Sequence, residues 1–231
     1  MKTRNTGNYI YISLLVVFII PLFSQEKPET SSEKPDTTKP KITLESLTKS
    51  SKTFKGMFEF YQDTLNGSLQ MLIKKDQLNK EFIHFVHTLD GVVDVGHFRG
   101  AYKSSKIFEI RKYFNRVEFI AINTSYYFDT NSPLSKASKA NINESVLASV
   151  EILHKDEKTE SILIKADDIF LSESLYQIKP APNPNIKPGM RFSLGSLNKK
   201  KCQYVSINNY PLNSDVAVKY VFDNPMPMNR G

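Results

Sequence analysis

The sequence predicts an α+β domain that is predominantly antiparallel β-sheet built of hairpins, with one or two short helices. Three observations lead to this class. Apolar and polar residues alternate over several short segments, the pattern of strands with one buried face. Turn signals such as Asn66-Gly67 separate these segments at hairpin spacing. Apolar residues at helical spacing are confined to short stretches, so the hairpins outnumber the helices too heavily for a doubly wound fold.

The clearest alternation lies in residues 81–128. One face of its first predicted strand carries Ile83, Phe85 and His87, and the intervening residues form the opposite face. Two further strands with the same alternation follow, on either side of a turn predicted at residues 113–117. A glycine-rich loop separates the first strand from the second.

The other elements are predicted from alternation, turn residues and helix-start signals. In chain order they are strands at 57–62 and 68–74, a polar connection at 74–79, a short helix from Ser132-Pro133 to about residue 141, strands at 146–155 and 160–165 around a turn at 156–158, a helical turn at 166–172, a proline-rich loop at 176–189, and strands at 203–208 and 216–222.

The N-terminal residues 1–24 have the organisation of a secretory signal peptide. Lys2 and Arg4 precede an apolar run at residues 10–23, which is too short for a comfortable membrane span of about 20 residues. We therefore expect an exported protein that is periplasmic, on the cell surface or secreted, with no stable membrane span after signal cleavage. An uncleaved N-terminal anchor is the alternative.

Three further segments follow the predicted signal peptide. Residues 25–41 consist almost entirely of Glu, Lys, Pro, Thr and Ser, which predicts a disordered linker because this composition cannot bury apolar surface. Residues 42–223 suit one β-rich domain, and residues 224–231 are predicted to form an extended tail.

Charge and cysteine content exclude several classes of protein. The formal net charge is +7, and the one tight basic run, Lys199–Lys201, is expected in a solvated loop, so no nucleic-acid partner is predicted. Cys202 is the single cysteine, so the domain has no internal disulfide and depends on its core. We expect Cys202 to be half-buried in a strand. The alternative is that it ligates zinc in a partner catalytic domain.

Several ordered segments resemble a known domain. They are FEFYQD at 58–63, KDQLNKEF at 75–82, DGV at 90–92, GHFRG at 96–100 and RKYF at 111–114. Together they resemble the N-terminal domain of unknown function that precedes the catalytic domain in exported bacterial zinc-dependent metalloproteases. The resemblance covers roughly residues 53–223.

This resemblance implies a non-catalytic accessory domain. In that family an H-E-x-x-H helix in a later domain holds zinc with its histidines and activates water with its glutamate. None of the four histidines here, His84, His87, His97 and His154, stands in such a context, and the chain ends at Gly231 where the family would continue. We therefore expect no catalytic, cofactor-binding or metal-binding residue in this chain. The expected partner is a metallopeptidase catalytic domain in cis, which would hold the zinc, and the tail at 224–231 would lead into it.

The most interesting polar residues lie in the loop after the first strand of the 81–128 block. They are Asp90, Asp94, His97 and Arg99, and glycines surround them. One interpretation is a contact loop for a peptide or a neighbouring domain, and the other is a hydrogen-bonded cluster that closes the loop. His84 and His87 should point to opposite faces of their strand, so they cannot chelate one ion.

A second class of function remains open. The chain could be a stand-alone periplasmic or surface module that binds peptide or glycan through its sheet face and the His97 loop. An accessory domain should expose an apolar patch where its partner packs, whereas a self-sufficient module should not.

Overall fold

The computed structural model describes residues 42–93, 96–126, 129, 131–133, 135, 144–181, 184–185 and 193–225. The predicted signal peptide and linker, most of the helix predicted from Ser132, residues 226–231 and Asp94 lie outside these residues. The described residues belong to one compact unit.

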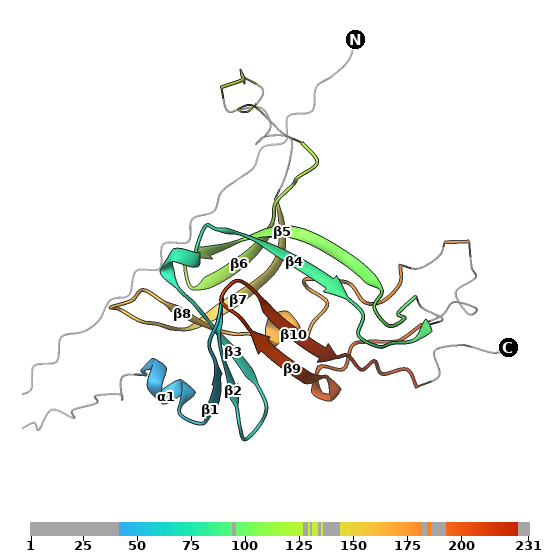
Figure 1. The fold of residues 1–231 in the computed structure, drawn as a ribbon, viewed down its shortest axis with the longest axis horizontal. Helices are drawn as coiled ribbons and strands as arrows, with labels where there is room; N and C mark the ends of the chain where they lie inside the picture. The colour runs from blue at the N-terminus through green and yellow to red at the C-terminus, as the bar shows by residue number, and fades with distance from the viewer. Residues whose placement is uncertain are drawn as a thin grey trace, which may run out of the picture. The chain divides into compact units, whose positions relative to one another are not determined.

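An antiparallel sheet of eight strands dominates this unit, as the sequence predicted, and a two-stranded sheet accompanies it (Figure 1). The strands of the larger sheet are β1 (Ser51–Phe54), β2 (Glu59–Asp63), β3 (Leu69–Ile73), β4 (Glu81–His87), β5 (Tyr102–Tyr113), β6 (Arg116–Ala121), β7 (Ser145–Lys155) and β8 (Ile162–Lys165). Their order is β1-β2-β3-β8-β7-β6-β5-β4, so β1 and β4 are the two edges. The smaller sheet consists of β9 (Gln203–Asn209) and β10 (Ser214–Lys219).

Helices are few and short. They are α1 (Leu44–Thr48), α3 (Asp167–Phe170) and the 3₁₀ turns η1 (Lys75–Gln77) and η4 (Lys199–Lys201). A capping box between Thr43 and Ser46 starts α1, since each side chain accepts a hydrogen bond from the backbone of the other residue. Leu44 and Leu47 of this helix pack on a small cluster formed by Tyr61, Leu72 and Leu163.

The main core follows the predicted alternation. On β5, Phe108 and Ile110 are buried, while Ile107 and Glu109 are only half-buried. On β4 the odd-numbered residues are exposed and the even-numbered ones are half-buried. The fully buried large side chains of the domain are Phe60, Leu69, Ile73, Ile110, Val117, Ile162, Leu163, Ile164 and Ile169.

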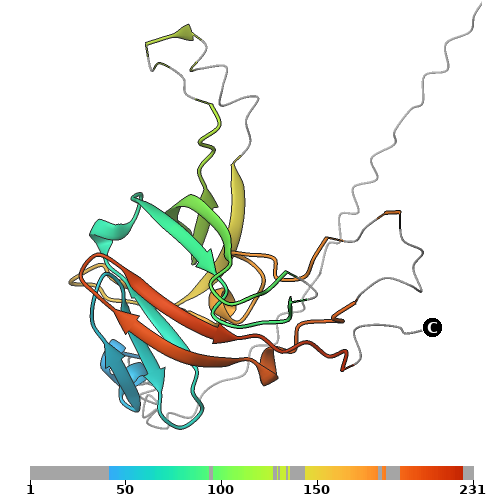
Figure 2. The ribbon, with the colours of Figure 1, turned by 45° about the vertical axis from the view of Figure 1, so that its right-hand side comes forward.

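The two-stranded sheet is fixed to the larger one by Asn209. Its side-chain amide donates to the carbonyl oxygens of Phe54, at 2.9 Å, and of Phe58. Gly56 permits this approach, because a Cβ there would lie 2.3 Å from Asn209 Oδ1. Ile207 completes the contact by packing in the main core. Figure 2 shows the two-stranded sheet lying in front of the curled larger sheet.

Some local details differ from the prediction. Neither α1 nor β1 was expected. The turn between β5 and β6 is shorter than predicted and consists of Phe114 and Asn115, with Phe114 in the left-handed region at φ 47°. Cys202 is buried just before β9 rather than half-buried within a strand, and its thiol donates to the Asn198 carbonyl oxygen at 3.3 Å.

Candidate functional site

The loop between β4 and β5 brings two of the predicted contact residues together. Arg99 donates two hydrogen bonds to the Asp90 carboxylate, Nε to Oδ1 at 2.9 Å and Nη2 to Oδ2 at 2.9 Å. His97 does not join this pair. Its Nε2 lies 3.0 Å from the carbonyl oxygen of Ile178, so the ring donates to the segment that follows α3. Asp94 lies outside the described residues.

Backbone hydrogen bonds also hold this loop in shape. Thr88 and Ala101 lie at its base, where Thr88 N donates to Ala101 O at 2.9 Å and Gly100 N donates to Thr88 O at 2.8 Å. Further along, His97 N donates to Val92 O at 3.1 Å. Backbone hydrogen bonds therefore fix the base of the loop, and large apolar side chains of its described residues are exposed.

Seven large apolar side chains on β4, on this loop and at the start of β5 are half or more exposed. We call this set the β4–β5 patch; it consists of Ile83, Phe85, Leu89, Val92, Val93, Phe98 and Tyr102. Their exposure ranges from 50 % for Val92 to 75 % for Ile83. Monomeric proteins rarely leave more than a few hundred Å² of contiguous apolar surface uncovered, so a concentration of this kind is typical of an interaction surface.

Aromatic contacts order the strand side of the patch. The rings of Phe85 and Tyr102 are 5.4 Å apart at 41°, and His87 lies 5.8 Å from Phe85. On the loop side, Lys103 lies 6.0 Å from the centre of the Phe98 ring, and its ammonium donates to the carbonyl oxygen of Gly96. The patch thus combines preorganised aromatic rings with a flanking positive charge.

The outer face of the sheet becomes charged beyond the patch. Arg111 on β5 binds Glu109 at 2.8 Å and the two carboxylate oxygens of Glu144 at 2.5 and 3.0 Å. This hydrogen bonding, chiefly with Glu109, raises the pKa of Arg111 above its usual value. The network marks one limit of the apolar surface.

The two histidines of β4 lie on opposite faces, as predicted. His87 is exposed and His84 is half-buried, and burial, followed by the charge of Lys106, lowers the pKa of His84. The Nδ1 atom of His84 is buried without a hydrogen-bond partner. Among the described residues, no three His, Cys, Asp or Glu side chains are placed to hold a metal ion.

A shallow depression away from the patch is lined by Leu72, Lys74, Lys75, Asp76, Thr159 and Ser161. It brings together two lysines and one carboxylate but no nucleophile–base pair of the kind used in covalent catalysis.

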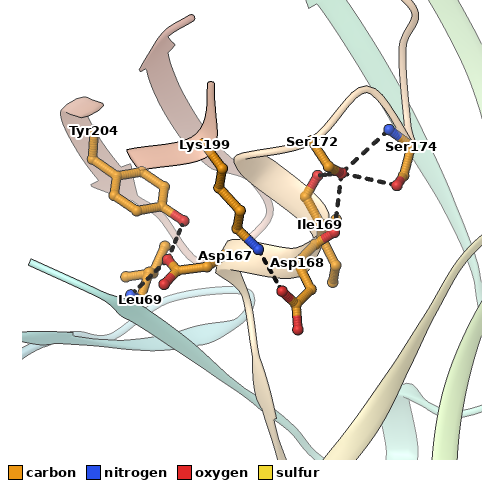
Figure 3. Close-up of polar contacts among 8 residues, drawn as sticks. All are labelled: Leu69, Asp167, Asp168, Ile169, Ser172, Ser174, Lys199 and Tyr204. Carbon is orange, nitrogen blue, oxygen red and sulfur yellow. Dashed lines mark hydrogen bonds and ion pairs between the residues drawn. The ribbon is translucent and has the colours of Figure 1, made fainter. Parts of the chain in front are cut away.

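A buried carboxylate, which no sequence motif pointed to, occupies the start of α3 (Figure 3). Asp167 is 6 % exposed, and its Oδ1 accepts from Leu69 N at 2.9 Å and from the Tyr204 hydroxyl at 2.8 Å. Burial and then the Asp167 charge raise the pKa of Tyr204 well above its usual value. The neighbouring Asp168 reaches outward to Lys199 instead. Asp167 is thus a structural tie between β3, α3 and β9.

Comparisons with known proteins return no relatives. No family model, no curated protein and no solved structure matches the chain. Within the described residues, none of the helices has the length and apolar content needed to span a membrane.

Proposed function

We propose that this chain is a non-catalytic accessory domain of an exported zinc-dependent metalloprotease. It packs against the catalytic domain and assists its folding or shapes substrate access. The proposal combines the resemblance of segments such as residues 58–63 and 96–100 to that family with one structural observation, the exposed β4–β5 patch.

The patch supports docking because seven large apolar side chains on one edge strand, on the loop that follows it and at the start of β5 are half or more exposed. Such a concentration of exposed apolar side chains is typical of a surface that a partner covers. Backbone hydrogen bonds hold the base of the loop, where Thr88 N donates to Ala101 O and Gly100 N donates to Thr88 O. Binding therefore costs little ordering of the surface.

Zinc and the water-activating glutamate belong to the partner in this proposal. The accessory domain contributes apolar contact, with Phe85 and Tyr102 as aromatic anchors of the kind that dominate binding energy at interfaces. Lys103, beside Phe98, suits an acidic residue at the rim of the partner surface.

The rival function is a stand-alone module that binds peptide or glycan. The exposed Phe85–Tyr102 pair is the observation that favours it, because sugar rings stack on exposed aromatic side chains. Both functions use the β4–β5 patch. The accessory domain would bind a peptidase domain there, and the stand-alone module would bind a peptide or a glycan.

The decisive experiment measures binding of the purified chain to an H-E-x-x-H peptidase domain encoded in continuation of, or beside, its gene. Ile83→Ser and Phe85→Ser should each weaken binding about tenfold or more, because each removes an apolar side chain that is exposed in the free chain and that the partner would bury. Val205→Ser on β9 is the matched control, since Val205 is as exposed as the patch residues and lies outside the patch.

Two results would overturn the proposal. One is equal loss of binding in the control and the patch variants. The other is hydrolysis of casein by the chain alone, abolished by a chelator. Saturable binding of an oligosaccharide or peptide array ligand, lost in Phe85→Ser while the peptidase domain does not bind, would establish the rival function.

A further inference from the structure

Strand β4 is an edge of the eight-stranded sheet. In the part of the chain that the structure describes, it is hydrogen-bonded in the ladder to β5 alone. An edge strand presents a row of backbone N–H and C=O groups that can pair with a further strand. It keeps one register with β5 over the six residues from Glu81 to Val86, and the one register shift of its ladder falls at its end, between Val86 and His87.

Two other edge strands, β1 and β10, carry features that discourage such pairing. β1 is only four residues long and contains Lys52, and Asn209 donates to its Phe54 carbonyl oxygen. β10 carries Asp215 and Lys219 and has a register irregularity in its middle. β4 contains no proline and no lysine, and its exposed face is apolar at the centre. Natural proteins protect edges of this length unless a partner covers them.

The residue pattern of β4 indicates what that partner is. If a second copy of β4 is placed antiparallel with His84 opposite His84 of the second copy, then Ile83 faces Phe85 of the second copy. In the same register, Glu81 faces His87 of the second copy. The exposed face is therefore self-complementary, with two apolar pairs at the centre and a pair of Glu81 with His87, which can hydrogen-bond, at each end. Within the described residues, neither Glu81 nor His87 has an ion-pair partner of its own.

A second observation lies at the centre of this register. His84 is half-buried on the inner face, and its Nδ1 is buried without a hydrogen-bond partner. The facing groups are Lys106, opposite it on β5, and the flanking Phe82 and Val86. Burial holds the ring neutral by lowering its pKa. In this register the His84 side chains of the two copies lie opposite each other on the inner face of the joined sheet.

We propose that two copies of this chain pair through β4, antiparallel and centred on His84, to form one continuous sheet across the two domains. The pairing uses the backbone edge and leaves the outer face open. The two β4–β5 patches then lie on the same side of the joined sheet. This inference stands on the edge strand and its pattern, so it does not depend on the proposed function.

Disulfide trapping tests the register directly. In the proposed dimer the two residues at position 84 are directly opposed, with Cα atoms about 5 Å apart, which a disulfide spans. Under mild oxidation His84→Cys should form a covalent dimer. The matched control is Ile83→Cys, because two copies of residue 83 would lie about 8 Å apart, beyond disulfide reach. The parent chain, which retains buried Cys202, controls for the native thiol.

Charge exchange tests the same register without a covalent bond. His87→Glu should raise the dimer dissociation constant about tenfold, because two glutamate pairs then face each other in each dimer. The double variant Glu81→His with His87→Glu again places a histidine opposite a glutamate in each pair. It should return the dimer dissociation constant to near the parent value. Sedimentation equilibrium measures all three proteins, and circular dichroism verifies that each is folded.

Three outcomes would overturn the inference. They are a chain that remains monomeric at hundreds of micromolar, cross-linking of Ile83→Cys as readily as His84→Cys, and a double variant no better than His87→Glu. None of these bears on binding of a peptidase domain to the outer face, so the proposed function is tested separately.

Discussion

The hydroxyl of Tyr204 donates a 2.8 Å hydrogen bond to Oδ1 of Asp167 and thereby ties the two-stranded sheet to α3. The same oxygen accepts from the backbone of Leu69 on β3. One buried carboxylate therefore connects three elements that are far apart in the sequence.

Asp167→Ala should lower the free energy of unfolding by about 3 kcal/mol, since it leaves the buried Leu69 N–H and the Tyr204 hydroxyl without their acceptor. Tyr204→Phe removes one hydrogen bond to a charged group and should cost about 1.5 kcal/mol. Asp168→Ala is the control, because its ion pair with Lys199 is half exposed and contributes at most about 1 kcal/mol. Urea unfolding measures the free energy of unfolding of all three variants. Equal losses in Asp167→Ala and Asp168→Ala would contradict the role of Asp167 in joining the three elements.

Stability should fall in acid partly through Glu109. The hydrogen bond from Arg111 lowers the pKa of Glu109 below its ordinary value of 4.5, against an opposing effect of burial. Because the unfolded state then binds more protons than the folded state, this contribution is complete above pH 4.5 and is lost as the pH falls below it. The stability difference between the parent and Glu109→Gln should therefore shrink from pH 7 to pH 3. A stability difference that stays constant from pH 7 to pH 3 would contradict this contribution of Glu109.

Gly91→Ala should disturb the loop between β4 and β5. A Cβ at this position would lie 2.6 Å from His97 Cβ and 2.8 Å from the His97 carbonyl oxygen, so the loop must shift. We expect faster amide exchange from Thr88 to Ala101 and weaker partner binding, with a global loss of about 1 kcal/mol. Arg99→Ala removes only an exposed ion pair and should leave amide exchange nearly unchanged at the loop base. Unchanged exchange in Gly91→Ala would contradict the close packing.

Core truncation should be costly at Ile164, which is fully buried between β3 and β7. Ile164→Ala should lower the unfolding free energy by about 2–5 kcal/mol and Ile164→Val by about 1 kcal/mol. Leu212→Ala, at the exposed turn before β10, should change it by less than about 0.5 kcal/mol. Similar losses at Leu212 and Ile164 would contradict the assigned core.

The sequence predicted the elements whose faces alternate. The strands β4, β5 and β6 lie where the alternation of apolar and polar residues between Ile83 and Ala121 predicted them. A strand with one buried face shows this alternation because every second side chain points into the core. β1 escaped prediction since Ser51–Phe54 carries one apolar side chain, and α1 because five residues are too few for a helical period. The pairing of β3 with β8 could not be read from local pattern either, because no turn joins the two strands.

The candidate site was predictable only in part. The glycine-rich loop and Arg99 stood out in the sequence, but the pairing of Arg99 with Asp90 rather than with His97 depends on the folded loop. The bond from His97 to Ile178 joins segments that no motif connects. Asp167 had one weak signal in the sequence, an acidic residue two positions after the buried strand β8, where a helix start favours negative charge.

The sheet order has a consequence for biosynthesis. β3 acquires its second neighbour, β8, only after the whole stretch from β4 to β7 has been synthesised, since Met71 pairs with Ile164. Non-local pairings of this kind slow folding, because the loop must close before the contact stabilises it. The chain should therefore emerge from the ribosome without a completed sheet.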